Sequence, residues 1–423
     1  MLESPALKFN GLNMSFNRKP TSSKTNSQTK ADIGLFEFVA LMALMTSLVA
    51  LSIDAVLPAL SQIGADLNIT DPRQSHLIVS LFFVGMAFGQ LYYGPLSDSK
   101  GRRYAIISGL IVFAIGSLVC IYAESLEVML IGRVIQAFGV SGPRIATLAV
   151  IRDKYDGEAM ARVMSFIMMV FILVPMLAPS FGQAILFWFS WQYIFSSFLI
   201  FGLVTGLWFF IRQPETLPKE KRLTFSWSQL WVSSKFILTN KLVMFYTISS
   251  GIIFGAFLAY ISSSQTLFQD IYDTGDLFPL YFALLAFSIG FASFINGHLV
   301  MRLGMRTLCT WAMIGWLIFT AVLTAFCFAY DGIPPLWQLI CILFCAFFCI
   351  GIMFGNINAM AMQPLGDMAG LGAAIIGSLG SIISVPTAVL VGSFIDDTVT
   401  PVALGFLGFG ALSFVLYWYA DKS

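Results

Sequence analysis

The chain has 423 residues, of which 58% are hydrophobic and only 11% are charged. Soluble domains are typically about 45–50% apolar and about 25% charged, so this composition excludes an ordinary water-soluble enzyme. The formal net charge of +1 leaves neither a basic excess for nucleic acid nor an acidic tail. All six cysteines lie in apolar stretches, which excludes the disulfide framework of a secreted protein. The composition therefore predicts a polytopic membrane protein.

The apolar stretches are long enough for helices that cross a bilayer, each of which needs about 20 residues. Runs such as 110–119 lack the alternation that is typical of membrane β-barrel strands, so the predicted fold class is all-α. Twelve transmembrane helices are predicted, at residues 35–61, 75–97, 105–123, 127–150, 160–185, 190–211, 241–268, 278–301, 307–329, 336–361, 371–394 and 401–420.

Polar segments divide the chain. Residues 1–34 are rich in Ser, Thr, Asn and Lys, which predicts a disordered cytoplasmic tail rather than a cleavable signal. The longest later polar stretch, 212–240, is predicted to be a cytoplasmic linker between two six-helix bundles at 35–211 and 241–423. Of 23 Lys and Arg residues, 20 lie on the side of the N-terminus and only one on the opposite side. Because cytoplasmic loops carry the positive excess, both termini are predicted to face the cytoplasm.

The two bundles share sequence patterns. The segments 94–103 and 297–306 have Gly, Leu, Gly and Arg in common at a shift of 203 residues, and Pro175 and Pro386 correspond at a shift of 211. These prolines are expected to kink their helices, either for movement or only for packing. Two repeated halves are typical of a transporter whose site lies between them.

Several segments resemble motifs of the major facilitator superfamily. Residues 94–103, Gly94-Pro-Leu-Ser-Asp98-Ser-Lys-Gly101-Arg102-Arg103, resemble its cytoplasmic loop motif, except that Ser99 replaces a usually basic residue. Residues 130–139, Leu-Ile-Gly-Arg-Val-Ile-Gln-Ala-Phe-Gly, resemble its motif in the fourth span.

Other segments are similar to the Bcr/CflA multidrug efflux branch of the drug:proton antiporters with 12 spans. They are 53–67, Arg152-Asp153 and 171–179, although the fifth span lacks the glycine-rich antiporter pattern. The resemblance implies two pseudo-symmetric six-helix bundles and export coupled to protons.

Two charges are predicted to lie at similar depth inside the membrane. Asp54 is about six residues from the outer end of the first span, and Arg133 is about six residues into the fourth. A charge at mid-membrane costs at least about 2.5–3.5 kcal/mol, which indicates function. If both spans line a common cavity, as the resemblance implies, the two side chains can meet. Asp54 is then the acid that carries the proton or recognises a cation, and Arg133 tunes it; the alternative is a static ion pair.

Four further residues are candidates for a substrate cavity. Arg144 is predicted near the cytoplasmic end of the fourth span, where it either reaches the lipid headgroups or contacts substrate. The resemblance implies that the seventh and tenth spans line the cavity, which adds Tyr260, Gln265 and Asn356. Aromatic walls with few polar groups suit amphipathic drugs.

A second constellation lies at the cytoplasmic ends of the second to fourth spans. The resemblance implies that Asp98, Arg102 and Asp153 form a charge cluster that holds an inner gate. Gly94 and Gly101 suit this role because glycine permits close approach and sharp turns. The alternative is the ordinary positive charge of a short cytoplasmic loop.

Other signals are weaker. Cys341, Cys345 and Cys349 share a helix face but are interpreted as packing, so no metal site is predicted. His76 and His298 are interpreted as polar residues at loop edges rather than as pH sensors. The sequence has no phosphate-binding loop, His-Glu-x-x-His or Gly-x-Ser-x-Gly motif. No enzymatic activity and no cofactor are therefore expected, and the proton gradient is the expected energy source.

The sequence thus predicts a secondary transporter that exports drug-like small molecules from a bacterial cytoplasmic (inner) membrane. Its expected partners are the small-molecule substrate, protons and the lipid bilayer, with no nucleic acid, and a monomer is expected. Two alternatives stay open. One is proton-coupled uptake of a metabolite, and the other is a sensor or scaffold that does not transport.

Overall fold

The computed structural model describes residues 33–422 apart from 70, 156, 223–226 and 396. Every secondary-structure element in this part of the chain is helical, which confirms the predicted all-α class. The predicted tail at 1–34 lies almost entirely outside the described residues. Twelve long helices correspond to the twelve predicted spans. Their bounds are α1 Leu35–Asp54, α3 Leu77–Lys100, α4 Arg102–Ile121, α5 Leu126–Lys154, α6 Gly157–Leu186, α7 Gln192–Arg212, α9 Lys241–Gln265, α10 Phe278–Leu303, α11 Met305–Ala329, α12 Leu336–Met362, α13 Ala369–Gly392 and α14 Thr400–Lys422.

Eleven of the helical segments in the described residues are long and apolar enough to cross a membrane. The twelfth helix, α6, contributes the apolar stretch Leu173–Leu186. Large apolar side chains cover the outside of the molecule; Phe36 is 88% exposed and Trp188 is 79% exposed. A surface of this kind is stable in lipid, because each helix satisfies its own backbone hydrogen bonds. The protein is therefore a multi-pass membrane protein.

The first predicted span is not one continuous helix. α1 ends at Asp54, and the chain continues through a short 3₁₀ turn, η1 (Leu57–Ala59), into α2 (Leu60–Asp66). Pro58 has no amide hydrogen to donate, and it sits in this turn. The break places Asp54 in the last turn of α1, where the helix leaves its final carbonyl groups without intrahelical donors.

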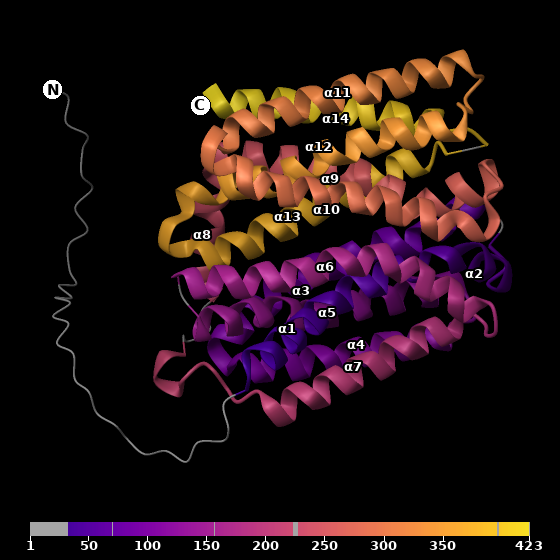
Figure 1. The fold of residues 1–423 in the computed structure, drawn as a ribbon. Coiled ribbons are helices and arrows are strands. Elements are labelled where there is room, and N and C mark those ends of the chain that lie inside the picture. The colour runs from indigo at the N-terminus through magenta and orange to yellow at the C-terminus, as the bar shows by residue number, and fades with distance from the viewer. Residues whose placement is uncertain (1–32, 70, 156, 223–226, 396, 423) are drawn as a thin grey trace, which may run out of the picture.

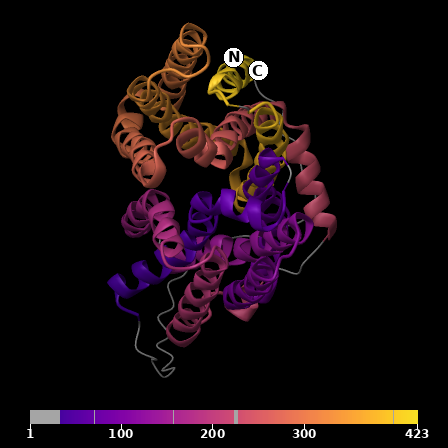
Figure 2. The same cartoon turned by 90° about the vertical axis from the view of Figure 1, so that its right-hand side faces the viewer.

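The long helices form two groups that lie side by side, α1–α7 and α9–α14 (Figure 1). α3 packs against α13 and α6 against α10 where the groups meet, and Figure 2 shows them viewed along the helices. The connecting segment contains α8 (Trp227–Thr239), a helix that the sequence analysis did not predict. We call the end where α8 lies, α1 begins and α14 ends the linker end, and the opposite end, which carries α2, the far end.

The repeated loops form the same turn in both groups. Gly101 joins α3 to α4 with a φ of 107°, and Gly304 joins α10 to α11 with a φ of 79°. Only glycine adopts such angles without steric cost. The two glycines found by the shift of 203 residues therefore end one long helix and begin the next within a single residue.

Glycines also set the close contact between α4 and α5. A Cβ atom added at Gly139 would lie 2.2 Å from the backbone nitrogen of Phe113, and one at Gly116 would lie 2.3 Å from that of Gln136. These distances leave no room for a methyl group. The two backbones touch, as is typical of membrane helices that pack through small residues.

Replacing Gly139 by alanine should therefore destabilise the first helical group. Overpacking costs about 1–3 kcal/mol, and a lower temperature of thermal unfolding in detergent should reveal it. Gly408→Ala on α14 is the matched control, because a Cβ there meets no atom within 4 Å. Equal unfolding temperatures for the two variants would contradict this account of the helix contact.

Candidate functional site

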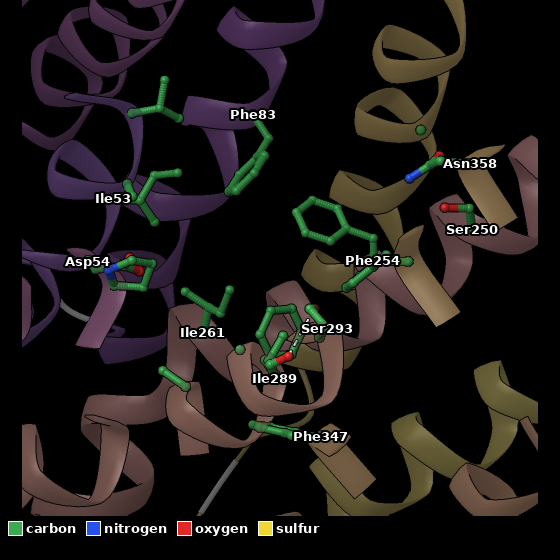
Figure 3. A pocket seen from close by; sticks show the side chains of 18 of the residues that line it. Ile53, Asp54, Phe83, Ser250, Phe254, Ile261, Ile289, Ser293, Phe347 and Asn358 are labelled. Carbon is green, nitrogen blue, oxygen red and sulfur yellow. Dashed lines mark hydrogen bonds between the residues drawn. The ribbon is translucent and has the colours of Figure 1, made fainter. Parts of the chain in front are cut away.

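A cavity of about 1420 Å³ lies between the two helical groups (Figure 3). α1, α3, α5 and α6 line it from the first group, and α9, α10, α12 and α13 line it from the second. Aromatic rings dominate the wall: Phe83, Phe254, Phe257, Tyr260, Phe282, Phe287, Phe291, Phe294, Phe347 and Phe354. Asp54 and Arg144 are the two Asp, Glu, Lys or Arg residues among the described residues of the wall.

Asp54 is the acidic group of the cavity. It lies at the end of α1, is 6% exposed and faces the space between the groups (Figure 3). In the part of the chain that the structure describes, its carboxylate makes no hydrogen bond or ion pair. Tyr260 of the second group lies within range of its charge, and the Tyr260 hydroxyl also lacks a hydrogen-bond partner there. Asp54 is therefore a buried carboxyl group opposite an aromatic wall.

Arg133 is fully buried inside the first group and does not pair with Asp54. Its Nε donates to the carbonyl of Ile78 at 2.9 Å, and its Nη1 donates to the carbonyl of Ser52 at 3.0 Å. Nη1 also donates to Oε1 of Gln136 at 2.6 Å, and the guanidinium carbon lies 4.4 Å from the centre of the Phe82 ring.

The predicted meeting of Asp54 and Arg133 as an ion pair is thus wrong for this conformation, although the predicted similar depth is correct. Ser52 is one of the last four residues of α1, whose carbonyls lack intrahelical donors. The Ser52 carbonyl, together with that of Ile78 on α3, accepts from the arginine in place of the carboxylate. Arg133 thereby joins α1, α3 and α5, and it touches the backbone only two residues from Asp54.

Two of the four predicted cavity residues line the cavity, and two do not. Arg144 and Tyr260 are in the wall; of the two interpretations of Arg144, this placement favours the one in the cavity. Asn356 instead donates to Oδ1 of Asn296 at 2.8 Å, and Asn358 lines the cavity in its place. Two residues along a helix correspond to a rotation of about 200°, which the sequence could not resolve.

The fourth predicted cavity residue, Gln265, ties the two groups together at the far end. Its Nε2 donates to the carbonyl of Pro58 at 3.0 Å, and its Oε1 accepts from the backbone nitrogen of Ser61 at 3.2 Å. Further hydrogen bonds between the groups at this end join His76 to Thr266, Arg73 to the carbonyl of Ser393, and Gln183 to Asp276. The groups are therefore in contact at the far end.

The cavity extends toward the linker end, where Gly297 and His298 line it. Away from the far end, the described residues form one hydrogen bond between the groups. In it, the Ser378 hydroxyl donates to the carbonyl of Ala87 at 2.8 Å. It lies midway along α3 and α13. The structure is therefore closed at the far end, and its cavity reaches the linker side.

The predicted charge cluster at the linker end is present. Nε of Arg102 donates to Oδ2 of Asp153 at 2.9 Å, and its Nη1 donates to Oδ1 of Asp98 at 2.5 Å. Arg102 is 4% exposed, whereas the Asp98 side chain is 44% exposed. All three residues belong to the first group. A Cβ at Gly94 would lie 3.8 Å from Ala374 of α13, so the start of this loop motif approaches the second group.

Glu215 belongs to the same cluster, and the sequence analysis missed it. Its Oε1 accepts from the backbone nitrogen of Arg102 at 3.0 Å, and its Oε2 accepts from that of Arg103 at 3.1 Å. A carboxylate that binds the first amides of α4 satisfies orphan donors and complements the helix dipole. Glu215 follows α7, more than 100 residues later in the chain, so no local signal indicated it.

Comparisons with known proteins agree with this architecture. A family model described as Major Facilitator Superfamily matches residues 42–387. Solved structures share the fold at low identity. One is a D-xylose-proton symporter, with a TM-score of 0.72, 14% identity, and coverage of 91% of this chain and 97% of that one. Another is the human organic anion transporter MFSD10, with a TM-score of 0.67, 17% identity, and coverage of 91% and 99%.

Bacterial relatives are more similar in sequence. The chain is 30% identical over 381 residues to an uncharacterized MFS-type transporter, YdgK, of Bacillus subtilis, covering 87% of this chain and 94% of the relative. It is 29% identical over 394 residues to a bicyclomycin resistance protein homolog of Haemophilus influenzae, covering 91% and 96%. It is 28% identical over 336 residues to multidrug resistance protein MdtL of Salmonella paratyphi A, covering 77% and 80%. The chain therefore belongs to the Major Facilitator Superfamily, and its similarity is to the Bcr/CflA-like members of that family.

Proposed function

We propose that the protein exports drug-like small molecules across a cytoplasmic membrane in exchange for protons. The observation that carries this proposal is the carboxyl group of Asp54, which has no partner among the described residues and is buried in a large aromatic cavity between two helical groups. The names of two relatives, a bicyclomycin resistance protein homolog and a multidrug resistance protein, support drugs as the substrate class.

Asp54 has the chemistry that proton coupling requires. A charged carboxylate inside a membrane is costly and is usually retained for function. Because Asp54 has no hydrogen-bonding partner among the described residues, a proton or a cationic substrate can occupy it without breaking another bond. Movement of the second group would change the distance between Asp54 and Tyr260, and with it the environment in which the proton binds. Arg133 holds α1 against α3 and α5 while this happens.

Contacts at the two ends support alternating access. The far end is joined by hydrogen bonds between the groups, whereas the cavity reaches the linker end. The positive-inside rule puts the linker end, with both chain termini, in the cytoplasm. In this state the cavity accepts substrate from the cytoplasm. The exposed carboxylate of Asp98, next to Gly94, is available to the second group when the linker end closes.

A single chain encloses the whole cavity, so the working unit is a monomer powered by the proton gradient without a cofactor.

Expression in a sensitised host distinguishes export from the two alternatives, which are uptake of a metabolite and a role without transport. Export raises tolerance to several unrelated drugs, uptake concentrates one solute inside the cell, and a sensor or scaffold does neither. Inverted membrane vesicles that accumulate the same drugs when a proton gradient is applied complete the test.

Asp54→Asn should reduce proton-driven drug accumulation in inverted vesicles by about tenfold or more, because asparagine keeps the shape but cannot carry the proton. Thermal unfolding should change little, since the carboxylate has no partner to lose in the described structure. Asp397→Asn, an exposed acid at the far end, is the control and should transport normally. Full proton-driven transport by Asp54→Asn would remove the basis of the proposal.

Asp98→Asn should slow transport several-fold while the protein still reaches the membrane, because Arg102 loses one of its two charged partners and the loop its exposed acid. Initial transport rates, normalised to the protein in the vesicles, measure the effect. The control is Glu220→Gln, which neutralises an exposed acid of the linker. Wild-type transport rates for Asp98→Asn would mean that the charged cluster has no role in transport beyond that of an ordinary cytoplasmic loop.

Gln265→Leu should make the far end open more often, because it removes two hydrogen bonds between the groups. Ile261→Cys places a cysteine in the cavity wall. In a variant without the six native cysteines, the labelling rate of this cysteine measures how often the far end opens. A membrane-impermeant maleimide added to the far side should label it several times faster with Gln265→Leu than with Gln265 retained. Gln338→Leu on α12 is the control, and identical labelling rates in all three proteins would contradict the closure assigned to Gln265.

A further inference from the structure

Arg144 is a cation in the cavity wall with no acidic partner among the described residues. Its Nη1 contacts the thioether sulfur of Met86, at 3.1 Å. A thioether is a weak acceptor. Two arginines that are more deeply buried differ in this respect: Arg102 binds two carboxylates, and Arg133 binds two carbonyls and an amide oxygen. Cations inside a membrane protein are normally paired in this way, whereas the half-buried Arg144 has no carboxylate or carbonyl partner among the described residues.

Asp54 does not supply that partner. Arg144 follows Arg133 by eleven residues on α5, which corresponds to about 16 Å along the helix. Arg133 reaches the last turn of α1, at the level of Asp54. The two charges of the cavity therefore lie at different depths, with Asp54 closer to the far end and Arg144 closer to the linker end. No direct ion pair joins them across this distance.

Gln90 adds a second hydrogen-bonding group near Arg144. It lies one turn after Met86 on α3, and residues four apart share a helix face. Gln90 is 7% exposed and lines the cavity, and its carboxamide lies against Gly377 of α13. A guanidinium and a carboxamide both present N–H donors, and a guanidinium binds carboxylates in a bidentate manner. Together they form an anion-binding surface on the cavity wall.

Across the cavity, the second group offers aromatic rings and hydroxyl groups. Phe254 lies 5.4 Å from the ring of Phe354 and 5.3 Å from that of Phe83 on α3, so the rings form a continuous apolar face (Figure 3). Ser250, Ser293 and Asn358 are the polar groups labelled on this side. No Asp or Glu of the second group is among the described lining residues. An anion at Arg144 therefore meets no like charge from the opposite wall.

We propose that Arg144 and Gln90 form a binding site for the anionic group of an aromatic substrate. A carboxylate there receives hydrogen bonds from the guanidinium and the carboxamide, while the aromatic body packs on the phenylalanine rings. The proposal rests on the export function proposed above and names the substrate class: amphipathic aromatic acids, including zwitterions that retain a carboxylate. Asp54 remains separate and available to the proton.

Binding of a matched pair of probes to the purified full-length protein in lipid nanodiscs tests the proposal. The probes are 2-naphthoate and 2-naphthamide, which differ in charge but hardly in shape, and isothermal titration calorimetry measures their dissociation constants. A charge-assisted pair favours the acid by about tenfold or more. Equal affinity for the acid and the amide would overturn the proposal.

Variants identify the site. Arg144→Gln should bring the ratio of the two affinities close to one by weakening the acid alone, and Arg144→Lys should restore part of the preference. Arg152→Gln removes an exposed charge from the same helix and should keep the wild-type ratio. If Arg144→Gln keeps the wild-type ratio of the affinities for 2-naphthoate and 2-naphthamide, the anion binds elsewhere and the proposal is wrong. If Arg144→Gln does not fold, Gln90→Glu provides an independent test, because a second acid beside Arg144 should abolish the preference.

The export function is tested separately, with proton-driven accumulation of the cationic dye ethidium in inverted vesicles. The wild-type protein and the control Arg152→Gln, which changes an exposed residue outside the cavity wall, should both transport the dye. Transport of ethidium without a preference for naphthoate refutes the anion site alone. A preference for naphthoate, with no transport of any drug, refutes the export function and leaves a cavity that binds aromatic acids.

Discussion

Arg133 determines how the first helical group is built around its buried charges. The guanidinium binds carbonyls on α1 and α3 and a side chain on its own helix, α5. Because two backbone carbonyls and an amide oxygen accept from it, the arginine holds three helices together without using the nearby acid. Asp54 is left at the cavity surface, two residues beyond the carbonyl that Arg133 binds. The hydrogen bonds of Arg133 thus separate a structural cation from the carboxyl group of Asp54 at the cavity surface.

Three arginines illustrate how position decides what a charge does. Arg102 lies at the linker end between two carboxylates and stabilises a loop. Arg133 lies in the protein interior and stabilises a helix junction. Arg144 lies in the cavity wall, where it contacts a thioether. Of the three, Arg144 is the one that a molecule in the cavity can reach, and it lies at a different depth from Asp54.

The two helical groups share the same arrangement of helices and turns, but they differ in their charged side chains. Gly101 and Gly304 make the same turn at corresponding places, yet the cluster built from carboxylates and Arg102 belongs to the first group. Glu215 completes it by binding the first amides of α4. In the cavity, both charged side chains come from the first group, whereas the second provides mostly aromatic rings. A molecule between them contacts a polar wall on one side and an apolar wall on the other.

The sequence alone determined the features that depend on local pattern. The lengths of the apolar stretches predicted the twelve helices. The uneven distribution of Lys and Arg between the two sides predicted that both termini face the cytoplasm. The resemblance of the loop motif to the family implied that Asp98 and Arg102 belong to one charge cluster, and the structure contains their contact. Only the tertiary structure decided which way side chains face, since each residue step rotates a helix position by about 100°. That rotation turned Asn356 away from the cavity and brought Asn358 and Arg144 into its wall. The structure also brought Gln265 to Pro58 and Glu215 to Arg102, because contacts between distant segments leave no trace in local periodicity.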